Sequence, residues 1–190
     1  MAQPGSKSVL FVQGGGKDVH AAWDNRLVAS LERELGSGYA VRYPRMPDEA
    51  NPKPAPWKEA IGRELRQLGE GTVLVGHSVG AAILLDYLAD GDGRQVTPAG
   101  VFLIAPPFIG DGGWPSDELR PTKRAAASLP KGVPIHLYQG RDDETVPVAH
   151  VGMFAKVLPD AKIRTLDGRD HQLNDDLSEV ARDIQRLTAA

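Results

Sequence analysis

The sequence of 190 residues contains no cysteine. This absence excludes disulfide bonds, thiolate metal ligands and a cysteine nucleophile. The sequence also lacks a run of about 18 consecutive apolar residues, which a membrane-spanning helix requires. No apolar segment before the first strand-like run is long enough for a signal peptide. We therefore expect a cytoplasmic protein that has no membrane partner.

A large excess of charge of one sign is also missing. The sequence has 25 acidic and 22 basic residues, which gives a formal net charge of −3. So small a charge does not favour a nucleic-acid or anionic-membrane partner. The hydrophobic fraction of 41% and the charged fraction of 25% are ordinary for a globular protein. A chain of this length can bury a core, and we expect one domain over residues 1–190.

Short apolar runs alternate with longer amphipathic stretches along most of the chain. The runs predict strands at residues 8–13, 39–44, 72–77, 100–105, 134–139 and 161–166. The stretches predict helices at residues 20–36, 57–69, 79–90, 146–159 and 174–187. Asn174 is the expected N-cap of the last helix. This alternation predicts an α/β fold, an open and mostly parallel twisted sheet of about six strands with helices on both faces.

In an open parallel sheet, reactive residues lie at the carboxyl ends of the strands. Residues 76–80 read Gly-His-Ser-Val-Gly and fall between a predicted strand and a predicted helix. At a sharp turn of this kind a side chain at position 76 or 80 would clash with the neighbouring backbone. The turn would expose the Ser78 hydroxyl and point the helix N-terminus toward it. We interpret Ser78 as a nucleophile and not as a helix cap.

A serine nucleophile needs a general base, and the base needs an orienting carboxylate. Beyond the serine, His136 falls inside a predicted strand and His150 inside a predicted helix, whereas His171 follows the last strand. His171 is therefore the predicted base. Asp142 and Asp143 both follow the preceding strand, and the carboxyl-end rule alone does not choose between them.

Acyl transfer also needs two N–H donors for the developing oxyanion. Val79, the residue after the nucleophile, is expected to provide one. The first strand ends in a glycine-rich segment, and glycine lets the backbone approach a substrate closely. Gly15 is the preferred second donor and Gly16 the other candidate, with Gly14 and Gly16 as candidate pocket residues. A phosphate-binding loop is the competing interpretation, but neither GxGxxG nor GxxxxGK[ST] is present.

These segments resemble the α/β-hydrolase superfamily over nearly the whole chain. The resemblance depends on Val-Gln-Gly-Gly-Gly at 12–16, on the Gly-His-Ser-Val-Gly segment, on the Gly-x-x-Asp-x-x-Val-Pro pattern of 140–147 and on Asp-His at 170–171. The short length and the serine segment are similar to compact bacterial serine hydrolases, including those related to retinoblastoma-binding-protein hydrolases. The sequence departs from many members at Gln13, where they carry histidine.

The resemblance implies an esterase-, thioesterase- or peptidase-like hydrolase that forms an acyl-enzyme with a small acyl substrate and needs no metal or organic cofactor. It implies a minimal fold without the first two antiparallel strands of the family and without a large cap domain. Asp143 occupies the aspartate position of the family pattern, which makes it the implied triad acid. His77 is the implied packing residue of the elbow and not the base.

Two proline-rich connections, residues 44–57 and 106–121, leave the carboxyl ends of predicted strands. Either they form rims or a small lid over the site, or they are stiff surface loops. Trp57 and Trp114 lie in these connections, and each either lines the acyl pocket or anchors its loop.

The sequence leaves other reactions open. The same triad serves acyl transfer, C–C cleavage and perhydrolysis. A non-catalytic binding module that keeps the fold is the alternative from another class. It is disfavoured because the serine, the acid and the histidine are all present.

Overall fold

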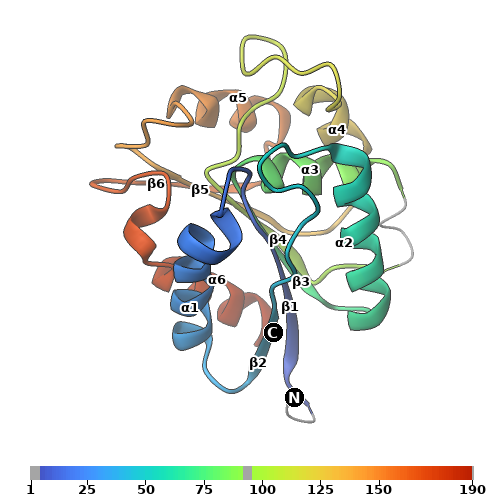
Figure 1. Cartoon of the computed structure of the whole chain (residues 1–190), viewed down its shortest axis with the longest axis vertical. Helices are drawn as coiled ribbons and strands as arrows, with labels where there is room; N and C mark the ends of the chain where they lie inside the picture. Colours follow the sequence, from blue (N-terminus) through green and yellow to red (C-terminus); the bar gives the residue numbers. More distant parts are fainter. Residues whose placement is uncertain (1–4, 92–95, 190) are drawn as a thin grey trace.

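The structure is a computed structural model that describes residues 5–91 and 96–189 (Figure 1). Its strands form one sheet in the order β2-β1-β3-β4-β5-β6, and all neighbouring strands run parallel. Their bounds are β1 Lys7–Val12, β2 Tyr39–Arg42, β3 Val73–His77, β4 Gly100–Ile104, β5 Ile135–Gly140 and β6 Lys162–Leu166. The six-stranded parallel α/β sheet predicted from the alternating pattern is therefore confirmed.

Helices cover both faces of the sheet (Figure 1). In the described ranges the α-helices are α1 Asp24–Leu35, α2 Pro54–Leu68, α3 Ser78–Ala89, α4 Thr122–Ser128, α5 Ala149–Val157 and α6 Ser178–Thr188. α1 packs against α6 on one face, and α2, α3, α4 and α5 pack in succession on the other. This arrangement follows from crossover connections that return each strand to a parallel neighbour.

The central strands are buried on both faces, which explains why they read as continuous apolar runs. In β1, Leu10 and Val12 belong to the core under α2–α5, whereas Val9 and Phe11 belong to the core under α1 and α6. This alternation is the two-residue period of a strand. All five residues of β3 and of β4 are buried. A rigid, doubly covered strand therefore ends directly before Ser78.

Helix α4 was missing from the sequence prediction. It has only seven residues, of which Thr122 and Ala125 are buried, so it offers too short an amphipathic pattern to be recognised. Helix α2 begins earlier than predicted, at Pro54. Proline suits the first turn of a helix because its fixed φ is already helical and its missing N–H is not needed there.

The prediction that Asn174 caps the last helix is wrong. Helix α6 begins at Ser178, whose N–H is accepted by Asp176 Oδ1 at 2.9 Å. Asn174 lies instead in a short 3₁₀ turn, η3 (Leu173–Asp175), with φ 55°. Its side chain accepts the Asp170 N–H at 3.0 Å and donates to the Gly168 carbonyl at 2.8 Å. Asn174 therefore braces the loop before α6, because asparagine tolerates the left-handed region.

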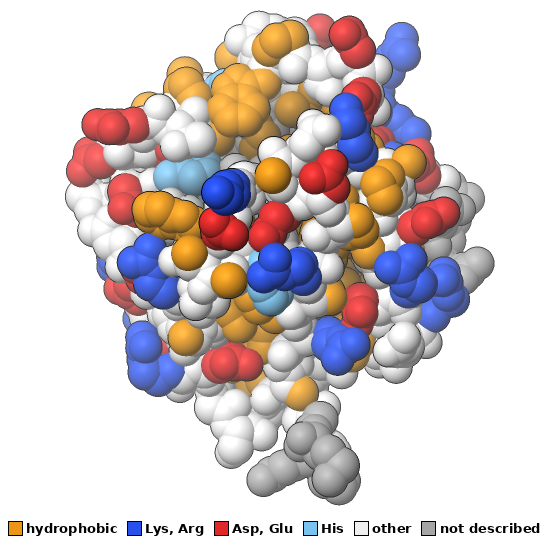
Figure 2. Space-filling model, in the orientation of Figure 1, with side chains coloured by type: hydrophobic (Ala, Val, Ile, Leu, Met, Phe, Trp, Pro, Cys, Tyr) orange, Lys and Arg blue, Asp and Glu red, His pale blue; other side chains and the backbone are white. Residues whose placement is uncertain are grey.

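Strands β1 and β3 are neighbours, but the chain leaves them toward opposite faces, to α1 and to α3. Open α/β sheets bind ligands at such a switch point, outside the carboxyl ends of the strands. Over the residues described, the connections carry no large cap domain, as the resemblance implies. Charges of both signs are interspersed on the face in Figure 2. None of the described helices combines the length and apolar character needed to cross a membrane.

Candidate active site

Ser78 lies at the junction of β3 and α3, with φ 52°. This left-handed conformation is unfavourable for most residues other than glycine, asparagine and aspartate. The turn is also crowded. A Cβ at Gly80 would lie 2.0 Å from the Gln13 carbonyl oxygen, and a Cβ at Gly76 would lie 2.8 Å from the Ala81 Cα. The spatial reason for glycine at 76 and 80 is therefore the one that the sequence predicts.

The glycine-rich loop after β1 lies directly beside this turn. The Gly14 N–H is donated to Asp24 Oδ2 at 2.7 Å. The Gly16 N–H is donated to the Glu49 carbonyl at 2.6 Å, so Gly16 cannot serve as the second oxyanion donor. No residue in the described part of the chain accepts the Gly15 N–H. Gly15 remains the candidate, together with the Val79 N–H at the start of α3.

His171 and Asp143 are joined by a hydrogen bond. His171 Nδ1 lies 2.8 Å from Asp143 Oδ2, and the Asp143 side chain is fully buried. The Thr145 and Val146 N–H groups both donate to Asp143 Oδ1 at 2.8 Å, and Gln139 Nε2 donates to Oδ2 at 2.7 Å. The carboxylate is thus held in one direction. The proton on Nδ1 of His171 leaves Nε2 as the basic nitrogen of the ring.

The electrostatics of Asp143 favour the charged form. Burial pushes the pKa of Asp143 upward, but the hydrogen bond from His171 and those from the Val146 and Thr145 amides outweigh it and bring the pKa below its ordinary value. The neighbouring Asp142 is exposed, and its N–H donates to the Arg169 carbonyl at 3.0 Å. Of the two aspartates, only Asp143 is bonded to His171.

Ser78 and His171 line the same cavity, which has a volume of about 360 Å³. Gly14, Gly15 and Gly16 line it as well. Its remaining lining residues are Lys17, Val19, Trp23, His77, Thr145 and Gln172. Residues from three strand ends, those of β1, β3 and β5, and from the loop after β6 therefore meet at one cavity, which is the arrangement that the carboxyl-end rule predicts.

A second cavity, of about 310 Å³, lies between the two proline-rich connections and is lined by Val79 and Trp114. Trp57 lines neither cavity. Its side chain is fully buried on α2, and its Nε1 donates to the Pro47 carbonyl at 2.6 Å. Of the two roles that the sequence leaves open for Trp57, the structure supports the anchoring one. Trp57 anchors the first connection, because the inward face of an amphipathic helix carries it into the core.

The first proline-rich connection is fastened to the glycine-rich loop. Gln13 Nε2 donates to Glu49 Oε2 at 2.7 Å, and the Met46 N–H donates to Gln13 Oε1 at 3.0 Å. Gln13 is the residue at which the sequence departs from many α/β-hydrolases. A buried glutamine supplies one donor and one acceptor here. Gln13 therefore connects the glycine-rich loop to the first proline-rich connection through hydrogen bonds from a neutral side chain.

The histidines that were set aside as bases lie inside the protein. His136 is 3% exposed and His150 is 5% exposed. His150 Nδ1 accepts the Phe108 N–H at 2.9 Å. His77 is buried beneath the elbow, where Nδ1 lies 2.9 Å from Asp24 Oδ2 and Nε2 lies 3.1 Å from the His171 carbonyl. His77 is therefore not a free base.

Several residues of the site were not identified from the sequence. Thr145 and Gln172 are close in sequence to the predicted acid and base, and that proximity could have indicated them. Trp23 and Asp24 lie in a π-helical turn, η1 (Val19–Trp23), and at the start of α1. Their stretch reads as an ordinary amphipathic helix. Gln139 reads as one more strand residue.

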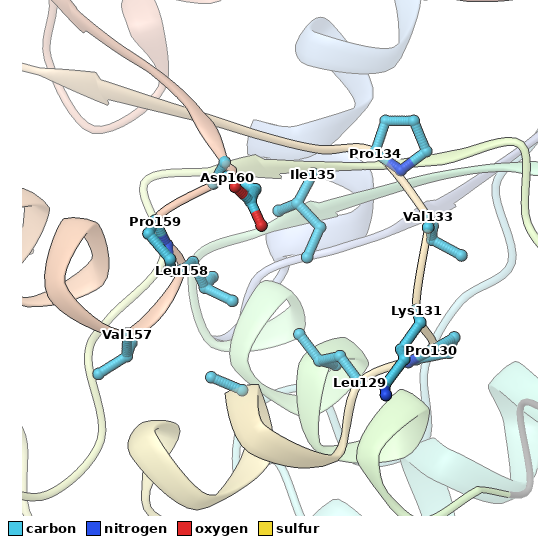
Figure 3. A pocket seen from close by; sticks show the side chains of 13 residues that line it. Leu129, Pro130, Lys131, Val133, Pro134, Ile135, Val157, Leu158, Pro159 and Asp160 are labelled. Carbon is cyan, nitrogen blue, oxygen red and sulfur yellow. The ribbon is translucent and has the colours of Figure 1, made fainter.

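Two further features bear on the site by exclusion. A cavity of about 450 Å³ is lined by residues between α4 and β5 and between α5 and β6 (Figure 3). It lies at the amino ends of these strands, whereas Ser78 lies at the carboxyl end of β3. Within residues 5–91 and 96–189, no three His, Cys, Asp or Glu side chains are grouped so that they could hold a metal ion.

Solved structures with the same fold include several hydrolases. The ydeN gene product from B. subtilis has a TM-score of 0.74 and 19% identity, over 97% of this chain and 100% of that chain. A monoacylglycerol lipase from Paleococcus ferrophilus has a TM-score of 0.68 and 17% identity, over 97% and 96%. An a/b serine hydrolase without lid from Xanthomonas campestris has a TM-score of 0.64 and 18% identity, over 100% and 83%. These likenesses show the fold.

Residues 9–188 match the model of the Alpha/beta hydrolase family. The match extends from β1 to α6 and includes every strand end that contributes to the cavity. No curated protein matches the sequence.

Proposed function

The chain belongs to the α/β-hydrolase family, and from this premise we propose that it is a serine hydrolase with Ser78 as nucleophile, His171 as base and Asp143 as orienting acid. The observation that carries the proposal is the hydrogen bond between His171 Nδ1 and Asp143 Oδ2 beside Ser78 in one cavity. The substrate we propose is a small ester, thioester or amide. The Paleococcus ferrophilus lipase and the Xanthomonas campestris serine hydrolase are in line with this class.

In the proposed reaction, Ser78 Oγ attacks the substrate carbonyl carbon while its proton passes to His171 Nε2. The negative charge that develops on the carbonyl oxygen is stabilised by the N–H groups of Gly15 and Val79. The carbonyl re-forms as the bond to the leaving group breaks, and His171 gives its proton to the departing alcohol, thiol or amine. Asp143 holds the imidazole in one tautomer and stabilises the imidazolium between these two transfers.

Hydrolysis of the acyl-enzyme repeats these steps with water. His171 Nε2 takes a proton from the attacking water, the tetrahedral intermediate collapses, and the same proton returns to Ser78 Oγ as the acid product leaves. Each proton that His171 accepts is given back within the same half-reaction, so the reaction needs no external acid, metal or cofactor.

A fluorophosphonate probe tests the proposal directly, because it phosphonylates only an activated serine. We expect the wild-type protein to be labelled and Ser78→Ala to remain unlabelled. Ser37→Ala removes an exposed serine and serves as the matched control, which should be labelled like the wild type. Labelling of Ser78→Ala would refute the assignment. A panel of acyl esters, thioesters and amino-acid amides then determines the preferred bond.

A further inference from the structure

A second aspartate–histidine pair lies beneath the nucleophile. Asp24 and His77 have side chains that are 0% and 2% exposed. Asp24 Oδ2 accepts the Gly14 N–H at 2.7 Å and lies 2.9 Å from His77 Nδ1. On its other side, His77 Nε2 lies 3.1 Å from the carbonyl oxygen of His171. One buried pair therefore contacts the glycine-rich loop, the elbow and the loop that carries the predicted base.

The contacts of His77 determine its protonation state. A backbone carbonyl oxygen can only accept a hydrogen bond, so Nε2 must carry a proton to bond the His171 carbonyl. An ionised carboxylate also only accepts, so Nδ1 must carry a proton to bond an ionised Asp24. A ring with a proton on both nitrogens is an imidazolium. With Asp24 ionised, the geometry thus requires a cation at His77.

The charge balance around the pair agrees with this geometry. Burial pushes the pKa of His77 downward, but the charge and hydrogen bond of Asp24 and the bond to the His171 carbonyl raise it above its ordinary value overall. Burial pushes the pKa of Asp24 upward, and the charge of His77 with the bonds from His77 and Gly14 lowers it overall. Asp24 Oδ1 is buried and has no hydrogen-bond partner among the residues that the structure describes, so the imidazolium is what compensates this carboxylate.

We propose that Asp24 and His77 are positioning residues, an ion pair that fixes the His171 loop and the glycine-rich loop to the nucleophile elbow. The proposal extends the proposed function, because it concerns how that site is held. His77 acts through the His171 backbone and Asp24 through Gly14, and both side chains are almost fully buried. Their loss should change how well the reacting groups are aligned, and leave binding of the ground-state substrate nearly as it is.

The protonation state of His77 can be measured without any reaction. Nitrogen-15 NMR of the wild-type protein, with labelled histidine, distinguishes a doubly protonated ring from a neutral one, and His77→Gln identifies the signal. If this variant does not fold, through-bond correlation from the labelled backbone identifies it in the wild type. We expect both ring nitrogens of His77 to be protonated at neutral pH. A His77 ring with one unprotonated nitrogen would overturn the proposal.

Kinetics with 4-nitrophenyl acetate test the positioning role. In Asp24→Asn we expect kcat to fall about 10²-fold, the cost of a misalignment of about 1 Å, while KM stays within about threefold. Asp183→Asn is the matched control. Asp183 is also a buried, paired aspartate, bonded to Tyr138 and Arg164. Unlike Gly14 and His77, the partners of Asp24, these two partners do not line the cavity. Asp183→Asn should lose stability and keep kcat.

Two outcomes would overturn the positioning role, namely an unchanged kcat in Asp24→Asn or an equal fall of kcat in Asp183→Asn. The double variant Asp24→Asn/His77→Gln replaces the ion pair with two amides that still form hydrogen bonds. It should fold and recover part of the kcat lost in Asp24→Asn, which keeps the test valid if that single variant unfolds. Recovery of the full wild-type kcat would show that the charges are not needed.

Failure of this inference can be told apart from failure of the proposed function. If the fluorophosphonate labels Ser78 in the wild type and kcat is unchanged in Asp24→Asn, the serine hydrolase stands and the positioning role is refuted. If the wild type is not labelled, the proposed function fails. In that case a neutral His77 ring in the NMR experiment refutes the ion pair, and a doubly protonated ring supports it.

Discussion

The two aspartate–histidine pairs have the same chemical groups in opposite settings. In the pair at the cavity, the His171 side chain is 14% exposed and bonds Asp143 through Nδ1. In the pair below it, His77 is almost fully buried and has an oxygen acceptor at each nitrogen. The two rings lie only 4.8 Å apart. The number of hydrogen-bond acceptors around each ring therefore distinguishes the two histidines. An imidazole with one nitrogen that has no acceptor can take up a proton as a base. An imidazole with an acceptor at both nitrogens holds two protons and is a structural cation.

The largest expected effect comes from replacing the two histidines with the same residue. His171→Gln removes the proposed base, and we expect kcat for 4-nitrophenyl acetate to fall on the order of 10⁶-fold, as when a triad histidine is lost. His77→Gln removes only the positioning cation and should cost about 10²-fold. Steady-state kinetics on both variants measure the difference. Equal losses would show that the two rings do not have separate roles.

The second prediction concerns the acid at the cavity. Asp143→Asn should lower kcat about 10⁴-fold, because the amide no longer selects the productive tautomer of His171. Asp142→Asn is the adjacent control. It is exposed and is not bonded to His171, so its kcat should stay within about twofold of the wild type. The reverse ranking would assign the acid to Asp142, and two equally mild effects would remove this loop from the triad.

The third prediction concerns the close packing between the nucleophile elbow and the glycine-rich loop, which lets the Asp24–His77 pair contact both segments and the His171 loop. Gly80→Ala places a Cβ against the Gln13 carbonyl, so the elbow and the glycine-rich loop must separate. We expect a loss of about 1–3 kcal/mol in the free energy of unfolding, measured with urea, together with a lower kcat. Gly152→Ala is the control, since a Cβ at this helical position meets nothing within 4 Å. It should be neutral or stabilising. An undisturbed Gly80→Ala would mean that the loops are not held this tightly.

The smallest expected effect is a pH dependence of stability. The pKa of His77 is raised above its ordinary value of 6.5, so above about pH 6.5 the folded state binds more protons than the unfolded state. Its contribution to stability is therefore lost as pH rises through the folded pKa. His136 and His150 have lowered pKa values, so their effect on stability occurs below about pH 6.5. The wild-type Tm should fall toward about pH 9.

The double variant Asp24→Asn/His77→Gln is the control for the pH dependence of the wild-type Tm. The ionisable groups that face His77 are Asp24, His171 and Asp143. His171 and Asp143 are present in both proteins, so the difference between the two Tm profiles reports the buried pair. The difference should shrink as pH rises above about 6.5. A constant difference from about pH 5 to about pH 9 would contradict an imidazolium at His77.

The fold and the cavity pair could be predicted because their signals are local. Most strands read as apolar runs. Ser78 follows its strand directly, and Asp143 and His171 lie in the loops just after theirs. The buried pair could not be predicted in this way. Asp24 and His77 are 53 positions apart, and Asp24 follows a helical turn and not a strand end. Only the packing of η1 and α1 against the elbow brings them together.

The two tryptophans give a second example of what the sequence could not predict. Trp57 and Trp114 lie in similar proline-rich segments, so the sequence treats them alike. Trp57 falls on the inward face of α2 and is fully buried, whereas Trp114 lines a cavity. The start of α2 at Pro54 decides this difference. Helix boundaries are the least certain part of a sequence prediction. Trp57 falls both in the proline-rich connection and at the start of the predicted helix, so the sequence left its role open.

The backbone conformation of Ser78 sets stability and reactivity against each other at one position. A residue other than glycine in the left-handed region costs roughly 1–2 kcal/mol, and Ser78 has φ 52°. Glycine would relieve that cost but would remove the hydroxyl. Selection for stability alone would therefore favour glycine at position 78, and serine persists only while its hydroxyl is useful. In directed evolution for thermal tolerance, Ser78→Gly would therefore gain stability and lose the proposed nucleophile.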